Sequence, residues 1–198
     1  KQVTGAEKLI QCLEREGVEY IFALSGGAAM PIFDALVDST IKLILVRHEQ
    51  GATHMADGYA RASNQPGVIL AGQNGPGATN LVTGIAQAAA AFSPVVSIAG
   101  SFSTKDKVQD AFQGIDQQSL FKPITKKTWT ITKTKKIPQI FSKAFNLAMS
   151  PRRGPVQLNL PRNILSETVK FNINQDNKSY KTENFTKGKK NNIKKAVK

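Results

Sequence analysis

One segment of this chain, Arg47-His48-Glu49-Gln50-Gly51-Ala52, places a carboxylate directly after the apolar run 41–46. The apolar run predicts a buried strand, and the small residues after Glu49 predict a helix that another backbone or a ligand can approach closely. The same order recurs where apolar residues 68–71 precede Gly72-Gln73-Asn74-Gly75-Pro76-Gly77 and an Ala-rich run. Ligands of open α/β sheets bind outside the carboxyl ends of strands, so these two strand ends predict a binding site.

Short apolar runs alternate with amphipathic runs along most of the chain. The sequence predicts strands over 20–24, 41–46, 68–71, 95–99, 128–132 and 156–160, and helices over 6–16, 28–37, 50–62, 78–92 and 137–149. This alternation predicts an α/β fold, a doubly wound, mainly parallel six-stranded sheet with helices on both faces. Thr4 and Glu7 predict a capping box at the first helix. The polar stretch 100–118 predicts a long loop, and loops of this length are commonly functional.

The character of the chain changes after residue 165. We expect one domain over 1–165 and a Lys- and Asn-rich linker toward a further domain over 166–198, because few residues of that segment are apolar. The formal net charge is +13, and a surface that binds nucleic acid is one explanation for it. We favour a lysine-rich surface without a nucleic-acid partner, because no aromatic interleaving, zinc-ligand spacing or recognition-helix pattern accompanies the lysines.

The composition indicates the cellular compartment in which the protein acts. Hydrophobic residues make up 40% of the chain and charged residues 21%, as in ordinary globular domains. No apolar run is long enough to cross a membrane. Cys12 is the single cysteine, which fits a reducing compartment. The sequence therefore predicts a cytoplasmic protein with no membrane partner.

The local sequence leaves two explanations open for each candidate motif. Glu49 is either a solvated surface acid or a carboxyl group that shares a proton with a ring nitrogen of a ligand. The turn Gly75-Pro76-Gly77 is either a tight turn favoured on steric grounds or an anion site at a helix N-terminus. His48 and His54 lack a third partner at metal-ligand spacing, so we expect structural roles for both and no metal site.

Four motifs of the chain occur together in a consistent order and spacing. They are Leu24-Ser25-Gly26-Gly27-Ala28, Arg47–Ala52 with His54–Ala62, Asn74–Asn80 with Leu81–Gly84, and Asp110-Ala111-Phe112-Gln113. In this register they resemble the amino-terminal pyrimidine-binding domain of thiamine diphosphate enzymes, most closely the large subunits of acetolactate synthases. The resemblance covers the segment 2–165 and implies the thiamine diphosphate-binding fold.

The resemblance implies a role for four residues toward the cofactor thiamine diphosphate. Glu49 would be the catalytic glutamate, which forms a hydrogen bond to N1′ of the aminopyrimidine ring and thereby promotes loss of the C2 proton of the thiazolium ring. Gly26, Pro76 and Asn80 would bind the pyrimidine side of the same cofactor together with Glu49. The fold would not depend on the Glu49 carboxylate.

The resemblance also bears on the substrate and on a second cofactor. Phe112 and Gln113 would line the substrate channel, and Arg152 would contact FAD if that cofactor is present. Acetolactate synthases usually have proline and serine where this chain has Ser25 and Asn74. The form with Asn74 is similar to sulfoacetaldehyde acetyltransferases of the same superfamily, so a substrate other than pyruvate stays open.

The resemblance also implies parts of the enzyme that lie outside this chain. In the family, Mg²⁺ and the diphosphate are bound by a Gly-Asp-Gly motif in a carboxy-terminal domain, and that motif does not occur in these 198 residues. The family's active site lies between subunits, which implies a homodimer or tetramer and makes this chain alone half a site. The leading hypothesis is a carboligase that decarboxylates a small 2-keto acid, pyruvate, and transfers the two-carbon unit to an acceptor. The alternatives are a sulfoacetaldehyde acetyltransferase, a glyoxylate carboligase, an oxalyl-CoA decarboxylase, or a non-catalytic association domain.

Overall fold

Six parallel strands form the central sheet of the computed structural model, which describes residues 2–107, 110–171, 194–195 and 197. The strands are β2 (Tyr20–Leu24), β3 (Lys42–Leu45), β4 (Gly67–Ala71), β5 (Val95–Ser101), β6 (Thr128–Thr130) and β7 (Val156–Pro161). Their order across the sheet is β3-β2-β4-β5-β7-β6. Every neighbouring pair is parallel, so the carboxyl ends of all six strands lie along one edge.

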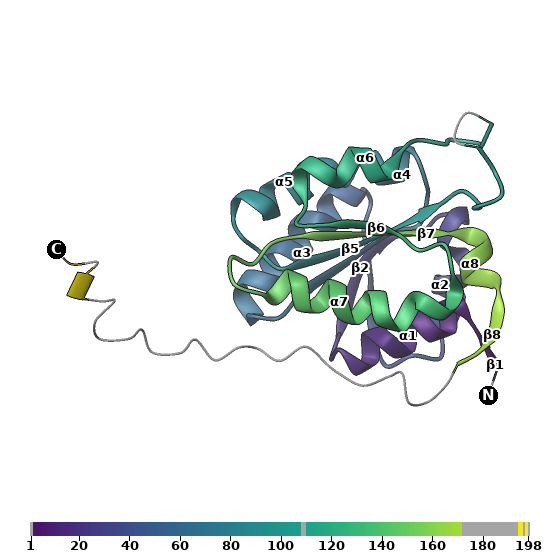
Figure 1. Ribbon diagram of the computed structural model, residues 1–198, viewed down its shortest axis with the longest axis horizontal. Coiled ribbons are helices and arrows are strands. Elements are labelled where there is room, and N and C mark those ends of the chain that lie inside the picture. Colours follow the sequence, from purple (N-terminus) through teal and green to yellow (C-terminus); the bar gives the residue numbers. More distant parts are fainter. Residues whose placement is uncertain (1, 108–109, 172–193, 196, 198) are drawn as a thin grey trace.

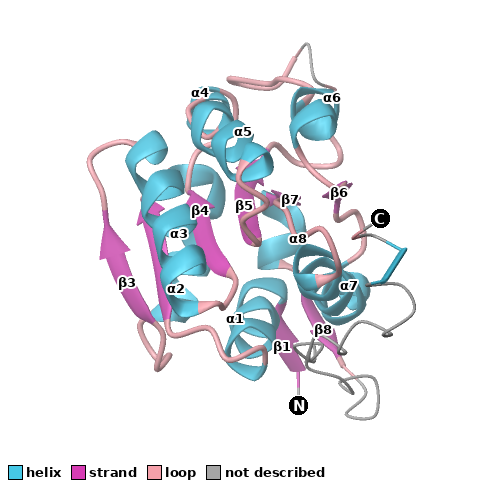
Figure 2. Cartoon of the chain, turned by 90° about the vertical axis from the view of Figure 1, so that its left-hand side faces the viewer, coloured by secondary structure: helices cyan, strands magenta, loops and turns pink. Residues whose placement is uncertain are grey.

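Helices cover both faces of this sheet (Figures 1 and 2). One layer contains α1 (Gly5–Arg15), α2 (Met30–Leu36), α7 (Ile137–Met149) and α8 (Arg162–Ser166), and the other contains α3 (Glu49–Ser63), α4 (Pro76–Thr79), α5 (Val82–Ala90) and α6 (Gln117–Phe121). Side chains alternate along β4, so that Val68 and Leu70 join the first core while Ile69 and Ala71 join the second. The predicted doubly wound α/β fold is confirmed. None of the helices in the described part of the chain is long and apolar enough to span a membrane.

The start of α1 follows the predicted capping box. The backbone N–H of Glu7 donates to the Thr4 hydroxyl at 3.1 Å, and the backbone N–H of Thr4 donates to the Glu7 carboxylate at 2.6 Å. Two of the N–H groups that lack partners at a helix start are thereby satisfied. Short 3₁₀ helices η1 (Gly27–Ala29), η2 (Lys122–Ile124) and η3 (Thr134–Lys136) connect the larger elements.

The predicted continuous helix 78–92 is wrong, because the chain is interrupted between α4 and α5. Asn80 and Leu81 lie at this interruption, and the N–H of Leu81 bonds to the carbonyl of Ala78 at 3.1 Å, one residue nearer than in an α-helix. Propensity alone favours continuation, since the run is rich in alanine. Asn80, at this interruption, is the residue whose side-chain amide donates to the Glu49 carboxylate.

A second, two-stranded sheet was not predicted. The strands β1 (Gln2–Thr4) and β8 (Thr168–Lys170) pair antiparallel, and the N–H of Gly5 donates to the carbonyl of Glu167 at 3.0 Å. Three-residue strands are too short to give a periodic signal. β8 lies within the segment 166–198 that we interpreted as a linker, of which residues 172–193, 196 and 198 lie outside the described part.

Candidate functional site

Glu49 lies at the carboxyl edge of the sheet, where β3 gives way to α3. It is the first residue of α3, and only 5% of it is exposed. The preceding residue, His48, is the N-cap, and its ring Nδ1 accepts a hydrogen bond of 3.1 Å from the N–H of Gln50. The histidine therefore has the structural role of fixing where α3 begins. Glu49, the next residue, is buried instead of pointing into solvent.

The Glu49 carboxylate has a protein partner on one of its two oxygens. The side-chain amide of Asn80 donates to Oε2 of Glu49 at 2.9 Å. The other oxygen, Oε1, has no hydrogen bond to any described residue. Gly77 leaves space beside it, since a Cβ atom on that glycine would lie 3.2 Å from Oε1. One carboxylate oxygen of Glu49 therefore faces a space that exists because residue 77 has no side chain.

The turn after β2 packs directly on the turn after β4 because both contain glycine. A Cβ on Gly26 would lie 2.5 Å from the carbonyl carbon of Gly72, and a Cβ on Gly72 would lie 2.2 Å from the nitrogen of Gly26. The N–H of Ala29 donates to the carbonyl of Gly72 at 2.8 Å and closes the contact. Gly26 is thereby placed beside the turn that leads to Pro76, which begins α4 and donates no backbone N–H.

The long loop between β5 and α6 lies on the same turn. The side-chain amide of Asn74 donates to the carbonyls of Phe112 and Gln113, at 2.9 and 3.1 Å. The side chain of Gln73 donates to the side-chain oxygen of Gln113 at 2.6 Å. Phe112, held in this way, is 80% exposed. The structure therefore brings together the predicted cofactor turn and the residues predicted to line the substrate channel.

A cavity of about 510 Å³ opens between these segments. Its lining residues are Gly27, Ala28, Gln73, Asn74, Ser101, Phe102, Ser103, Asp106, Ala111, Phe112 and Arg162. Among these lining residues, Arg162 carries the positive charge and Asp106 carries the negative charge. The sequence analysis missed Arg162, although its position after a strand, like that of Glu49, was a usable signal.

Comparison with known proteins identifies the family of this chain. Residues 3–120 match the model of the thiamine pyrophosphate enzyme N-terminal TPP binding domain. The chain belongs to the thiamine pyrophosphate enzyme family. It is 52% identical over 160 residues to a probable acetolactate synthase large subunit of Methanocaldococcus jannaschii, covering 81% of the chain and 27% of that relative. It is 44% identical over 200 residues to the acetolactate synthase large subunit of Buchnera aphidicola, covering 98% of the chain and 34% of that relative. The chain thus spans about a third or less of the length of these relatives.

The site of this thiamine pyrophosphate enzyme domain fits the aminopyrimidine ring of its cofactor. A fixed carboxyl group can share a proton with a ring nitrogen, and Glu49 has one oxygen without a protein partner among the described residues. Flat rings need space beside that oxygen, and Gly77 leaves it. Gly26 allows the neighbouring turn to approach without a side chain in between. The residues that would hold the ring are therefore Glu49, Asn80, Gly26 and Pro76.

Arg152 does not join the other predicted site residues. It precedes β7, so it lies at the amino-terminal edge of the parallel sheet, whereas Glu49 lies beyond the carboxyl edge. Its guanidinium group lies over the ring of Phe92, 4.8 Å from the ring centroid. Both residues have the left-handed backbone conformation, with φ values of 55° and 54°. The role of Arg152 toward FAD stays a prediction.

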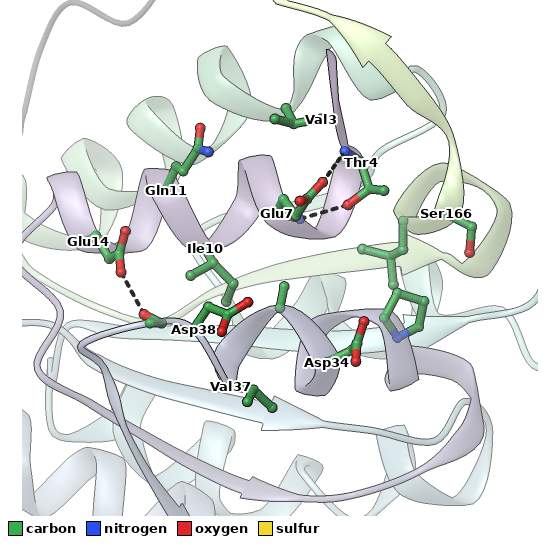
Figure 3. A pocket seen from close by; sticks show the side chains of 14 residues that line it. Val3, Thr4, Glu7, Ile10, Gln11, Glu14, Asp34, Val37, Asp38 and Ser166 are labelled. Carbon is green, nitrogen blue, oxygen red and sulfur yellow. Dashed lines mark hydrogen bonds between the residues drawn. The ribbon is translucent and has the colours of Figure 1, made fainter. Parts of the chain in front are cut away.

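A larger cavity, of about 610 Å³, lies elsewhere in the domain. Figure 3 shows that it is a groove between α1 and α2, with carboxylates from both helices. Two of these carboxylates already accept protein hydrogen bonds, Glu7 from Thr4 and Glu14 from the Ser39 hydroxyl at 2.7 Å. None of the predicted site residues lines the groove. Among the described residues, no group of three or more His, Cys, Asp or Glu is placed to hold a metal ion.

Proposed function

We propose that this chain is the amino-terminal part of an acetolactate synthase-like enzyme. The complete enzyme would use thiamine diphosphate to decarboxylate a 2-keto acid, pyruvate, and transfer the two-carbon unit to an acceptor. The names of the relatives support this assignment, as they are acetolactate synthase large subunits. The observation that carries it is the buried Glu49 carboxylate, held by Asn80 on one oxygen and open on the other.

The chain's own residues would prepare the cofactor for the reaction. When bound, thiamine diphosphate supplies an electron sink for the decarboxylation of a 2-keto acid. Oε1 of Glu49 would share a proton with N1′ of the aminopyrimidine ring, and the hydrogen bond from Asn80 to Oε2 keeps the carboxyl group in one orientation. The low exposure of Glu49 keeps water from competing for this proton.

The cavity beside the long loop would receive the substrate. A 2-keto acid carries a carboxylate, and the guanidinium of Arg162 is the group in the cavity lining that binds carboxylates best. Phe112 and Gln113 would form the outer side of the same channel. The volume of about 510 Å³ is ample for a small acid of the size of pyruvate.

The remaining parts of the enzyme would come from outside this chain. We propose that Mg²⁺ and the diphosphate are bound by a carboxy-terminal domain, and that the active site forms between subunits of a homodimer or tetramer. Arg152 would contact FAD as a second cofactor. The enzyme would act in the cytoplasm, for which the lone, buried Cys12 is the supporting observation.

One observation favours a second candidate, a sulfoacetaldehyde acetyltransferase. Asn74 stands where acetolactate synthases usually have serine, and its side chain holds the loop that borders the substrate cavity. A change at this position can alter the shape of the cavity, and therefore the acid that it accepts. Sulfoacetaldehyde has a sulfonate in place of the carboxylate, and Arg162 could bind either anion.

The test uses the full-length protein. It is incubated with pyruvate, thiamine diphosphate and Mg²⁺, and acetolactate is quantified, with a sample lacking the cofactor as the control. We expect acetolactate that depends on added cofactor. A parallel assay supplies sulfoacetaldehyde and phosphate. Bound cofactor without acetolactate, and release of sulfite with acetyl transfer to phosphate in the parallel assay, would overturn the leading assignment in favour of the second candidate.

A further inference from the structure

Asn74 holds the long loop through two consecutive backbone carbonyls. Its amide nitrogen donates to the carbonyl of Phe112 at 2.9 Å and to that of Gln113 at 3.1 Å. The residue is only 6% exposed, so water competes weakly for these bonds. One amide nitrogen carries two hydrogens, and each has an acceptor here.

The backbone of the loop lies against the turn at the same point. Gly75 has φ +56°, and a Cβ on it would lie 2.2 Å from the carbonyl oxygen of Gln113. Gln113 itself has φ 55°, a left-handed conformation that costs free energy in a residue other than glycine. Such a conformation persists only when surrounding contacts impose it. The two bonds from Asn74 and the bond from Gln73 are among these contacts, together with the bond of 2.8 Å from the N–H of Gly114 to the carbonyl of Ala111.

The held segment forms one wall of the cavity described above. Asn74, Gln73 and Phe112 all line it. The start of the same loop is fixed separately, because the side chain of Asn163 accepts a bond of 3.0 Å from the N–H of Thr104 and donates one of 2.9 Å to the Thr104 hydroxyl. The bonds from Asn74 therefore give the loop a second attachment, at its Phe112 end, and the segment that contains Lys105 lies between the two attachments.

We infer that Asn74 is a positioning residue, which holds the backbone of Phe112 and Gln113, keeps Phe112 in the wall of the substrate cavity and thereby sets the affinity for the small acid substrate. This inference rests on the proposed function. The side-chain amide of asparagine suits this role, since aspartate has the same shape but donates no hydrogen bond, serine donates one, and alanine none. We therefore expect the largest effects from aspartate and alanine and a smaller effect from serine.

The experiment uses the full-length protein and the variants Asn74→Asp, Asn74→Ala and Asn74→Ser. The matched control is Asn146→Asp, because the amide of Asn146 also donates to a backbone carbonyl, that of Ser142 at 2.7 Å, but on α7 and outside the cavity lining. The first measurement is the rate of limited trypsin cleavage after Lys105, which lies exposed in the loop. The second is KM and kcat for whichever donor the enzyme uses, pyruvate or sulfoacetaldehyde.

Loss of both bonds should release the loop without disturbing Glu49. We expect cleavage after Lys105 to become about tenfold faster in Asn74→Asp and Asn74→Ala, with a smaller change in Asn74→Ser and none in the control. KM for the donor should rise by about tenfold while kcat and the affinity for thiamine diphosphate change by less than about threefold. If Asn74 only stabilised the fold, its variants would not raise KM while leaving kcat nearly unchanged.

The two parts of the experiment separate this inference from the proposed function. Faster cleavage and a raised KM for sulfoacetaldehyde, with no activity on pyruvate, would support the positioning role while contradicting the acetolactate assignment. An unchanged cleavage rate in Asn74→Asp would contradict the positioning role, whatever the substrate. So would faster cleavage with KM unchanged, because the loop would then be held without affecting the substrate.

Discussion

The side-chain amide of Asn80 and the carboxylate of Glu49 are joined by a hydrogen bond of 2.9 Å, although the two residues are 31 positions apart in the sequence. Each residue follows a different strand of the parallel sheet, Glu49 after β3 and Asn80 after β4 and the short helix α4. The bond fixes the carboxyl group through one oxygen and leaves the other available. The site is thus built from two strand ends that the fold brings to one edge.

Replacing Asn80 by leucine, which is similar in size but donates no hydrogen bond, tests this pairing. We expect kcat of the full-length enzyme to fall by about 10- to 100-fold, because a hydrogen bond to a charged group is lost and the carboxyl group is no longer held in one orientation. Steady-state kinetics measure the effect. A variant with the kcat of the wild type would show that the bond does not orient Glu49.

Gly77→Ala should weaken cofactor binding without unfolding the domain. The added Cβ would lie 3.2 Å from Oε1 of Glu49 and 3.0 Å from Cβ of Gln73, in the space that the pyrimidine ring would use. We expect the affinity for thiamine diphosphate to fall by at least about tenfold, measured by calorimetric titration in the presence of Mg²⁺.

The matched control for this variant is Gly58→Ala. Gly58 lies in α3, and a Cβ there would meet nothing within 4 Å. Alanine favours helix over glycine, so the control should gain up to about 1 kcal/mol in the free energy of unfolding and keep its cofactor affinity. Equal loss of affinity in both variants would contradict the specific role of Gly77.

Asp116 gives α6 a stability that depends on pH. Its side chain accepts hydrogen bonds from the Ser119 hydroxyl at 2.5 Å and the Ser119 N–H at 3.1 Å, and these bonds lower the pKa of the carboxyl group. Because the pKa of Asp116 is lower in the folded state, these bonds stabilise the fold when the pH is above the pKa of the unfolded chain, about 3.9. This contribution to the free energy of unfolding is lost as the pH falls through the pKa of the folded state.

Urea unfolding of Asp116→Ala and the wild type at pH 6 and pH 3 checks this dependence. We expect the variant to lose about 1 kcal/mol or less at pH 6, as for a helix N-cap, and still less at pH 3. Asp116→Asn, which caps without titrating, should keep the same difference from Asp116→Ala at both pH values. A loss in Asp116→Ala that is equal at both pH values would contradict the prediction.

Arg152→Ala should affect the binding of FAD without affecting the binding of thiamine diphosphate. The guanidinium group packs over Phe92 at the edge of the sheet opposite to Glu49, so its removal should leave the affinity for thiamine diphosphate unchanged. If Arg152 contacts FAD, the flavin content of the purified full-length enzyme should fall, which its absorbance spectrum measures. Reduced thiamine diphosphate affinity with full flavin content would contradict this separation.

Much of the fold could be predicted because its signals are local. β4 is buried on both faces, with Val68 and Leu70 in one core and Ile69 in the other. A continuous apolar run between helical segments is the sequence signal of such a strand. The interruption at Asn80 could not be predicted, because alanine-rich sequence favours continuation of the helix.

The candidate site was predictable only in part. Glu49 stood out because it follows a strand, and the family resemblance supplied Gly26, Pro76 and Asn80. The hydrogen bonds from Asn74 to the loop join residues that are 38 and 39 positions apart, and no sequence pattern indicates such a contact. Arg162 could be found only from its position after a strand, because a basic residue in a lysine-rich chain does not stand out by composition.

Proton exchange at C2 of bound thiamine diphosphate tests the role of Glu49 most directly. The exchange rate in D₂O is measured by acid quench and NMR for the full-length wild type and for Glu49→Gln, each saturated with cofactor. Because Oε1 of Glu49 would share the proton at N1′, we predict that the substitution slows exchange by at least about 100-fold while the circular dichroism spectrum stays the same. Exchange at the wild-type rate in Glu49→Gln, with the cofactor bound, would contradict the account.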